Sequence, residues 1–182
     1  NFKMAQWDTQ LTELGFQLGV AASGAHHRIV TAESCTGGLL AGAITEIAGS
    51  SEWYEMGFVT YATPTKSRFL GVDPALIERE GVVSEPVAQA MARGALAQFP
   101  EATLSVGITG YAGPSGGTPA MPTGSVCIGW GYRFNEHIVT ISRVIHVPGS
   151  RAAVRREAVI VALSGLLELI RHANPAIMPS AY

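Results

Sequence analysis

A short turn near the start of the chain combines the residue types that nucleophilic chemistry needs. The segment Glu33-Ser34-Cys35-Thr36-Gly37-Gly38 holds two hydroxyls, a thiol and two glycines between a β-branched run, 28–32, and an apolar run, 39–47. This order predicts a strand, a tight turn and a helix, whose free N–H groups and dipole favour an anion or an oxyanion beside Ser34. Hydroxyls at Ser34 and Thr36 also suit helix caps, so the turn alone leaves a structural interpretation open.

Lysine is scarce, since the chain has two lysines against ten arginines. Lys3 lies in Asn1-Phe2-Lys3, which precedes Met4 and resembles a cloning remnant, so Lys66 is the lysine of the expected fold. Burial can lower the pKa of a lysine far enough for general-base catalysis, whereas arginine stays protonated. Because lysine activates serine on several folds, Lys66 is the candidate base for Ser34. A solvated lysine with no role is the alternative.

Other nucleophilic arrangements fit the sequence less well. The chain has two aspartates, Asp8 and Asp73, and its five histidines show no motif spacing, so a Ser-His-acid triad would need a glutamate such as Glu33. Cys35 is a rival nucleophile beside Ser34, but a free cysteine is most often a small buried hydrophobe. Ser34 and Lys66 therefore remain the leading pair.

A Gly- and Pro-rich segment and two arginines can complete a binding site. The segment 110–119 is not a P-loop, because no Gly-Lys-Ser/Thr follows it, yet it can line a pocket. Arg151 and Arg155 lie four residues apart on one face of a predicted helix, a spacing that suits a phosphate or a carboxylate. A solvated helix face or an interface salt bridge explains these arginines equally well.

Alternating strands and helices must position these residues. Apolar periodicity and turn signals predict helices at 7–22, 39–47, 84–99 and from Ser150 onward, with a short helix through Phe69 and a helical turn after Pro74. Strands are predicted at 28–32, 57–61, 104–109, 125–130 and 137–147, the last two joined by a hairpin at 131–136. The pattern indicates one three-layer α/β/α domain with a mixed sheet over 1–182, its core at about 8–172.

The composition favours a well-buried domain and excludes several classes of protein. Hydrophobic residues make up 47% of the 182 residues and charged residues 14%, which argues against disorder. A net charge of −2 without a basic run argues against a nucleic-acid partner. With no apolar stretch of ~18–20 residues and no signal-peptide segment, we expect a cytoplasmic protein and no membrane partner.

Cysteine usage and the distribution of apolar residues give two further expectations. Cys35 and Cys127 are too few for a disulfide scaffold and lack CxxC spacing, so neither a structural zinc nor another metal is expected. The apolar last helix, together with tryptophans and tyrosines taken as exposed, favours a homo-oligomer, and the tail 174–179 can cross to a neighbour.

Five motifs follow one another in the order found in a known family. They are Ala32-Glu33-Ser34-Cys35-Thr36-Gly37-Gly38, Ile47-Ala48-Gly49-Ser50-Ser51, Gly57-Phe58-Val59-Thr60-Tyr61, Gly81-Val82-Val83-Ser84-Glu85-Pro86-Val87 and Gly110-Tyr111-Ala112-Gly113-Pro114-Ser115-Gly116-Gly117. The chain resembles the competence/damage-inducible CinA C-terminal domain, the nicotinamide-nucleotide amidase (PncC) family. The resemblance implies the three-layer fold, a stand-alone form without the larger N-terminal domain, and no cofactor. It also implies hydrolysis of nicotinamide mononucleotide to nicotinic acid mononucleotide and ammonia.

The same resemblance assigns roles to residues of this chain. Ser34 is the expected nucleophile; neutral Lys66 would take its proton, and Tyr61 would relay or orient that proton. The remaining expected groups are substrate-binding, either as N–H donors to an oxyanion or as ligands of the nucleotide phosphate. They are Thr36, Gly37, Gly38, Gly110, Gly113, Arg151 and Arg155.

The chain departs from the family's pattern in two places. The family commonly reads Tyr-Ser-Asn-Glu-Ala-Lys where this chain has Tyr61-Ala62-Thr63-Pro64-Thr65-Lys66, and often has Glu-Lys where this chain has Ala120-Met121. Three functions therefore stay open: the mononucleotide amidase, an amidase for a different amide, and a pyridine-nucleotide or phosphate-binding protein that has lost turnover. The family name also suggests a role in DNA uptake or damage response, and the weak net charge without a basic stripe argues against direct contact with DNA.

Overall fold

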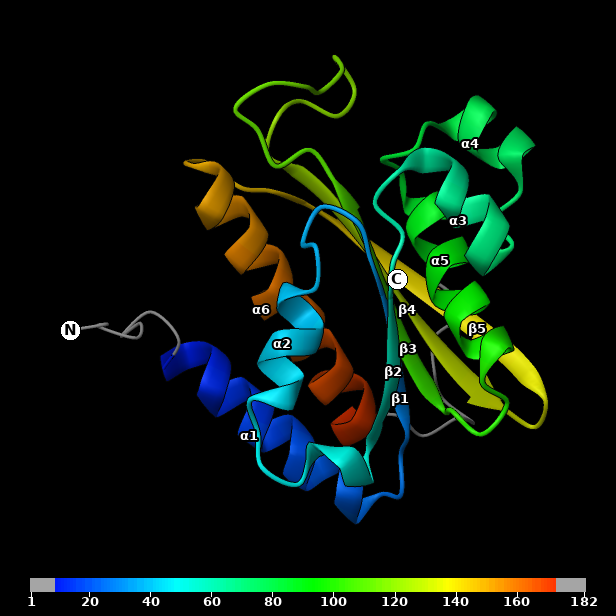
Figure 1. The fold of residues 1–182 in the computed structure, drawn as a ribbon, viewed down its shortest axis with the longest axis vertical. Helices are drawn as coiled ribbons and strands as arrows, with labels where there is room; N and C mark the ends of the chain where they lie inside the picture. The colour runs from blue at the N-terminus through cyan, green and yellow to red at the C-terminus, as the bar shows by residue number, and fades with distance from the viewer. Residues whose placement is uncertain (1–8, 173–182) are drawn as a thin grey trace.

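A mixed five-stranded sheet lies at the centre of the computed structural model, which describes residues 9–172 (Figure 1). The strand order is β2-β1-β3-β4-β5. The parallel strands are β1 (Ile29–Glu33), β2 (Tyr54–Val59) and β3 (Leu104–Gly110). The antiparallel strands are β4 (Ser125–Phe134) and β5 (His137–His146). Every residue of β1 is buried, as expected for a parallel strand covered on both faces.

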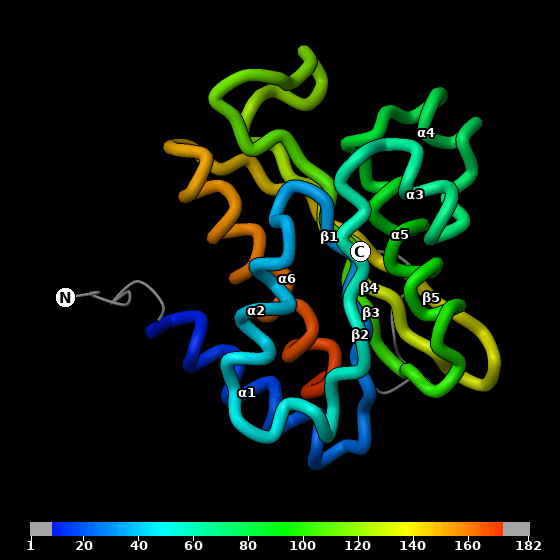
Figure 2. Tube along the Cα trace, viewed as in Figure 1, coloured from blue at the N-terminus to red at the C-terminus, as the bar shows by residue number. Residues whose placement is uncertain are grey.

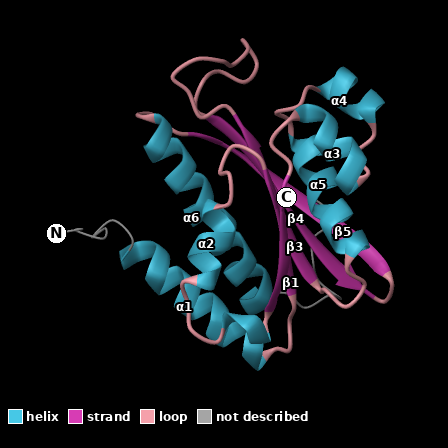
Figure 3. Cartoon of the chain, viewed as in Figure 1, coloured by secondary structure: helices cyan, strands magenta, loops and turns pink. Residues whose placement is uncertain are grey.

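Helices cover both faces of the sheet, which confirms the predicted three-layer α/β/α architecture (Figure 3). One face carries α1 (Thr9–Gly24), α2 (Leu39–Thr45) and α6 (Arg151–His172). The other face carries α3 (Thr63–Leu70), α4 (Pro74–Glu80) and α5 (Glu85–Gln98). A short 3-10 helix, η2 (Ser50–Glu52), leads into β2. The parallel strands all end at the same edge of the sheet, which is where the predicted site residues follow them.

Two sheet glycines allow α5 to approach β3 and β4 closely. A Cβ at Gly107 would lie 2.6 Å from the Ala88 carbonyl oxygen, and a Cβ at Gly129 would lie 2.6 Å from the same carbonyl group. Real Cβ contacts are not that short, so a side chain at either position would push the helix off the sheet. The packing of α5 thus depends on the absence of two side chains.

The ends of several elements differ from the sequence prediction: α2 ends at Thr45 instead of residue 47, and β2 ends at Val59 instead of residue 61. β2 begins at Tyr54, three residues before the predicted start, and β4 continues to Phe134 instead of stopping at Trp130. The hairpin is correspondingly tighter than the predicted 131–136, because its turn consists of Asn135 and Glu136, both with positive φ. Strand pairing decides these limits: β4 keeps its register with β5 through Phe134.

Two predicted helix caps are confirmed. Ser84 accepts a hydrogen bond from the Val87 amide at 3.4 Å at the start of α5, and Ser150 accepts one from the Ala153 amide at 3.2 Å at the start of α6. Trp7, Asp8 and the tail 174–179, to which further expectations were attached, lie outside the described residues.

The described tryptophans do not supply the exposed surface on which the homo-oligomer was partly predicted. Trp53 and Trp130 are both buried, and the Trp130 indole donates a hydrogen bond to the Ala162 carbonyl at 3.1 Å. The expectation was wrong because a large aromatic side chain gains most when the core surrounds it.

Within residues 9–172, none of the helices is both long enough and apolar enough to cross a membrane.

Candidate active site

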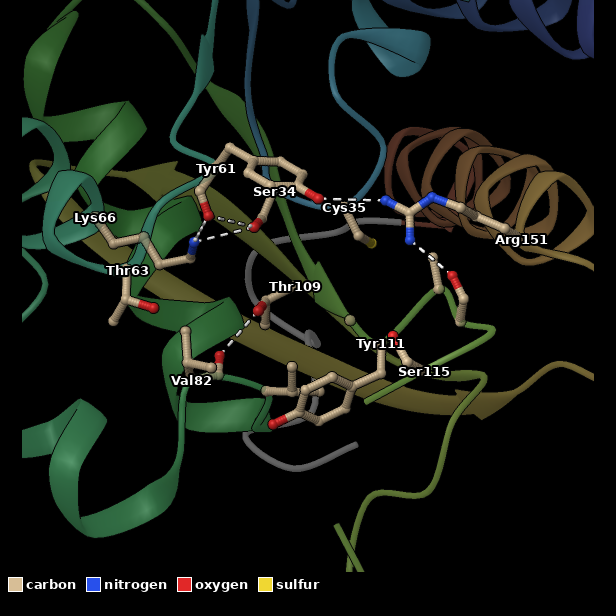
Figure 4. Close-up of a pocket in the computed structure, with 14 residues that line it drawn as sticks. Ser34, Cys35, Tyr61, Thr63, Lys66, Val82, Thr109, Tyr111, Ser115 and Arg151 are labelled. Atoms are coloured by element: carbon tan, nitrogen blue, oxygen red, sulfur yellow. Dashed lines mark hydrogen bonds between the residues drawn. The ribbon is translucent and has the colours of Figure 1, made fainter. Parts of the chain in front are cut away.

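The site lies at the edge of the sheet where the three parallel strands end. Ser34 directly follows β1, Lys66 lies in α3 just after β2, and Gly110 is the last residue of β3. The Gly-rich connection 111–124 projects from this edge (Figure 2). Its first residues and the three residues above line a cavity of about 220 Å³ (Figure 4). The carboxyl ends of parallel strands are the usual place for a ligand in open α/β sheets.

Ser34 and Lys66 are in direct contact. The Lys66 ammonium nitrogen Nζ lies 3.0 Å from the Ser34 hydroxyl oxygen Oγ (Figure 4). Nζ also donates to the Thr60 carbonyl at 2.6 Å and to the Tyr61 carbonyl at 3.3 Å. The two salt bridges found among residues 9–172, Arg28–Glu55 and Arg79–Glu80, do not involve Lys66. A lysine that is 1% exposed therefore has only uncharged hydrogen-bond partners here.

This environment changes the protonation of Lys66. Burial lowers the pKa of Lys66 from 10.5 to about 8, because the ammonium ion loses its hydration. Near neutral pH a useful fraction of the lysine is thus the free amine, as a general base requires.

The hydrogen-bond geometry suits both protonation states of Lys66. The ammonium ion has three N–H donors for three neighbours, namely the Thr60 carbonyl, the Tyr61 carbonyl and Ser34 Oγ. The neutral amine has two donors, which the two carbonyls accept, and one lone pair, which then faces Ser34 Oγ. When Lys66 is charged, the Ser34 hydroxyl has the Tyr61 carbonyl as an acceptor at 3.4 Å. The Ser34 proton can therefore turn from this carbonyl to Lys66 without moving a heavy atom.

Tyr61 reaches the site in a different way from the sequence prediction. Its main-chain carbonyl contacts Ser34 and Lys66, whereas its hydroxyl accepts a hydrogen bond from Arg151 at 3.2 Å (Figure 4). The Tyr61 side chain is 60% exposed and lies across the mouth of the cavity. In the described part of the chain the Tyr61 hydroxyl thus contacts Arg151 and neither Ser34 nor Lys66.

Neither predicted hydroxyl caps α2. Gly38 is the N-cap residue, and the buried Glu33 carboxylate accepts the free N–H groups instead, from Gly38 at 3.2 Å, Leu40 at 2.9 Å and Ala41 at 3.1 Å. Thr36 Oγ1 also donates to Glu33, at 2.6 Å. A carboxylate satisfies several N–H donors at once and carries the charge that a helix N-terminus favours, so it replaces the hydroxyl caps.

Three predicted substrate-binding residues of this turn lie outside the cavity. Thr36, Gly37 and Gly38 do not line it. The Gly37 N–H donates to the Ser34 carbonyl at 3.0 Å, and the Gly38 N–H is bound by Glu33. Gly110 and Gly113 do line the cavity, as predicted.

The rival nucleophiles are placed unfavourably. Cys35 lines the cavity but is buried, and burial raises its pKa to about 11, so the thiol stays protonated at neutral pH. None of the residues that line the cavity is a histidine, so a Ser-His-acid triad does not form around Ser34. The geometry thus brings together the serine and the lysine that the sequence put forward as candidate nucleophile and base.

The two arginines of α6 have different partners. The Arg151 guanidinium lines the cavity and donates to the Gly113 carbonyl at 2.7 Å and to the Tyr61 hydroxyl at 3.2 Å. Arg155, one helical turn further on, does not line the cavity. It donates to the Cys35 carbonyl at 3.0 Å and to the Thr36 carbonyl at 3.4 Å. The structure therefore separates two residues that the sequence had grouped as phosphate ligands.

Several cavity residues were not singled out from the sequence as site residues. They are Thr63, Val82, Val83, Thr109, Tyr111, Ala112 and Ser115. Thr63 carries a usable signal, because it falls where the chain departs from its family. The other departure lies elsewhere: Ala120 and Met121 do not line the cavity, and Met121 packs beside Val83 and Cys127.

Fold and site together define a three-layer α/β protein with a buried serine–lysine pair at the carboxyl end of its parallel strands. The chain belongs to the CinA C-terminal domain family, whose model matches residues 11–170. It is 45% identical over 159 residues to a Pseudomonas putida protein named nicotinamide-nucleotide amidohydrolase PncC, and the alignment covers 87% of this chain and 96% of that protein.

Longer relatives and solved structures agree with this family. A CinA-like protein of Mycobacterium tuberculosis is 49% identical over 136 residues, which cover 75% of this chain but 31% of that relative. The crystal structure of the competence/damage inducible protein CihA from Agrobacterium tumefaciens superposes with a TM-score of 0.83 at 37% identity. That superposition covers 91% of this chain and 99% of the other.

Proposed function

We propose that this chain is a nicotinamide-nucleotide amidohydrolase, which releases ammonia from the carboxamide of nicotinamide mononucleotide. The observation that carries the proposal is the 3.0 Å contact between Ser34 Oγ and Lys66 Nζ in the cavity. The similarity to the Pseudomonas putida amidohydrolase along almost its full length supports the same substrate class.

The first half of the reaction forms an acyl-enzyme. Neutral Lys66 takes the Ser34 proton as Oγ attacks the carboxamide carbon, and the resulting oxyanion needs N–H donors. Since the Gly37 and Gly38 amides are already bonded, the Cys35 amide beside the nucleophile is the donor we assign; in the described part of the chain it donates to no oxygen of another residue. Lys66 then returns its proton to the leaving nitrogen, the C–N bond breaks and ammonia departs.

The second half of the reaction regenerates the serine. Lys66, again neutral, takes a proton from water as the water oxygen attacks the nicotinoyl ester carbon. The C–Oγ bond breaks, and Ser34 recovers its proton from Lys66. The product is nicotinic acid mononucleotide, whose new carboxyl group releases its proton to the solvent. No step of this sequence uses the Tyr61 hydroxyl, which we assign to substrate binding.

Arg151 is the residue that we propose binds the nucleotide phosphate. Its guanidinium lies on the rim of the cavity and has further N–H donors beyond the two that contact Gly113 and Tyr61. We expect Arg151→Gln to raise the KM for the mononucleotide at least tenfold and to leave hydrolysis of a substrate without phosphate unchanged.

Thr63 favours a second candidate, an amidase for a different amide. It lines the cavity at a position where relatives commonly carry asparagine, so its shorter side chain gives the pocket a different set of hydrogen bonds. The test is ammonia release by the wild-type protein and by Ser34→Ala from nicotinamide mononucleotide, nicotinamide riboside and nicotinamide. Activity on the mononucleotide that Ser34→Ala abolishes supports the first proposal. Activity confined to the other amides supports the second, and binding without turnover contradicts both.

A further inference from the structure

Two oppositely charged side chains hold the turn that carries Ser34. The Glu33 carboxylate is completely buried beneath the turn and accepts hydrogen bonds from four donors. These donors are Thr36 Oγ1 and the amides of Gly38, Leu40 and Ala41. Arg155 reaches the same turn from α6 and binds the carbonyls of Cys35 and Thr36 at 3.0 and 3.4 Å. Three N–H groups of the segment thus point to an anion, and two of its carbonyls point to a cation.

The turn needs such support because its own sequence is permissive. Gly37 and Gly38 have φ values of 57° and 103°, and glycine reaches these and many other conformations with little difference in energy. A turn of this composition loses much backbone entropy when it is fixed in one conformation. Charge-assisted hydrogen bonds from two directions supply the restraint.

The position of the turn determines the geometry of the reaction. Ser34 Oγ must stay 3.0 Å from Lys66 Nζ, and the Cys35 amide must stay beside the reacting carbon. Arg155 binds the carbonyl of the peptide group that follows Cys35. Glu33 is the residue immediately before Ser34 in the chain, so its anchored side chain also restrains the nucleophile. A shift of about 1 Å in such a group typically costs about 10²-fold in rate.

We propose that Arg155 and Glu33 are positioning residues for the Ser34 nucleophile and that Arg155 does not bind the substrate. This inference rests on the proposed function only in taking Ser34 as the nucleophile. It assigns the two arginines of α6 to different steps: Arg151 binds the nucleotide, and Arg155 keeps the nucleophile in register with its base.

The test separates positioning from binding by two readouts. Steady-state ammonia release from nicotinamide mononucleotide gives kcat and KM. The second readout needs no nucleotide: a fluorophosphonate probe reacts with Ser34, where the Oγ–P bond forms, fluoride leaves, and Lys66 takes the hydroxyl proton. Ser34→Ala is the blank for labelling. Arg171→Gln is the matched control, because Arg171 is exposed in the last turn of the same helix.

We expect Arg155→Gln to lower kcat and the labelling rate about 10-fold to 10²-fold and to leave KM within about twofold. Arg155→Lys, which keeps the charge and one or more N–H donors, should recover part of both rates. A KM that rises tenfold or more with unchanged labelling would overturn the inference and make Arg155 a substrate ligand. The inference would also be overturned if Arg155→Gln had the wild-type kcat, KM and labelling rate.

Glu33 is tested by a variant that keeps its shape. Glu33→Gln removes the negative charge and places an amide NH2 group against the Ala41 N–H, so we expect the labelling rate to fall at least tenfold. Glu46→Gln at the exposed end of α2 is the control. Unchanged labelling in folded Glu33→Gln contradicts the inference for this residue. If Glu33→Gln does not fold, the Arg155 variants decide the matter. Labelled wild-type protein that does not hydrolyse the mononucleotide would refute the proposed function and leave the labelling comparison valid.

Discussion

The Arg151 guanidinium donates a hydrogen bond to the Tyr61 hydroxyl at 3.2 Å, although the two residues lie 90 positions apart in the chain. This bond joins the N-terminus of α6 to the segment between β2 and α3 across the mouth of the cavity. The hydroxyl that the resemblance implied as a proton relay thus accepts a hydrogen bond from Arg151 and keeps its own O–H. The contacts of Tyr61 with Ser34 and Lys66 come from its main-chain carbonyl, which no substitution of its side chain removes.

The first prediction concerns Tyr61→Phe, which removes the hydroxyl that Arg151 contacts. Because the variant loses one exposed hydrogen bond of about 0.5–1.5 kcal/mol, we expect kcat for ammonia release to stay within about tenfold of wild type. Lys66→Met, which removes the base, should lower kcat by about 10²-fold to 10⁴-fold. A Tyr61→Phe variant as inactive as Lys66→Met would return the relay role to the Tyr61 hydroxyl.

The pH dependence of the reaction should report Lys66. Since the base must be neutral and its pKa is lowered to about 8, we expect kcat/KM to rise with pH and to level off above about pH 8. Steady-state rates between about pH 6 and about pH 10 measure this profile. A profile that stays flat across that range would exclude Lys66 as the base.

The same lowered pKa makes stability depend on pH. Below pH 8 Lys66 is protonated in both the folded and the unfolded states, and the folded state bears the full cost of a buried cation. Between about 8 and 10.5 the folded state loses its proton first, so the unfolded state binds more protons and this residue's contribution makes stability rise with pH. We expect the gain in unfolding free energy from Lys66→Met to be largest below pH 8 and to shrink toward pH 10.5, as denaturant titrations at each pH can show. If the gain in unfolding free energy from Lys66→Met grew with pH, the predicted direction of the pH dependence would be wrong.

Thr60 offers a test of the packing beside the base. Its hydroxyl is buried and has no hydrogen-bond partner among residues 9–172. We expect Thr60→Val to raise the free energy of unfolding by about 1 kcal/mol, because it removes an unsatisfied polar group without changing the side chain's shape. The matched control is Thr31→Val, since the buried Thr31 hydroxyl is bonded to the Tyr54 hydroxyl at 2.8 Å. Chemical denaturation should show this control to be less stable than wild type.

The glycine at the contact between α5 and the sheet gives a final prediction. A Cβ at Gly129 would meet the Ala88 main chain at 2.6 Å, so Gly129→Ala should destabilise the protein by several kcal/mol. A Cβ at Gly42 in α2 would meet no other atom within 4 Å, so Gly42→Ala should be neutral or stabilising by up to about 1 kcal/mol. Melting temperatures of the two variants should move in opposite directions, and equal shifts would contradict the packing described.

Much of the fold was predictable because its signals are local. The strand, turn and helix around Ser34, the caps at Ser84 and Ser150 and the alternation of strands with helices all depend on periodicity and turn chemistry within a few residues. The strand limits were not predictable to the same degree, since β4 extends to Phe134 only because β5 pairs with it throughout. The same holds for Trp130, whose burial depends on α6.

The candidate site also has features that the sequence could predict and features that it could not. The sequence by itself put forward Ser34 and Lys66 as candidate nucleophile and base, because their residue types can react together, and left a helix cap and a solvated lysine open as alternatives. The tertiary structure alone decided which atoms meet: the Tyr61 carbonyl at Lys66, the Glu33 carboxylate at the start of α2, and Arg155 on the turn instead of in the cavity. Residue types and short spacings state what a group can do, whereas its partner depends on how segments distant in the chain pack together.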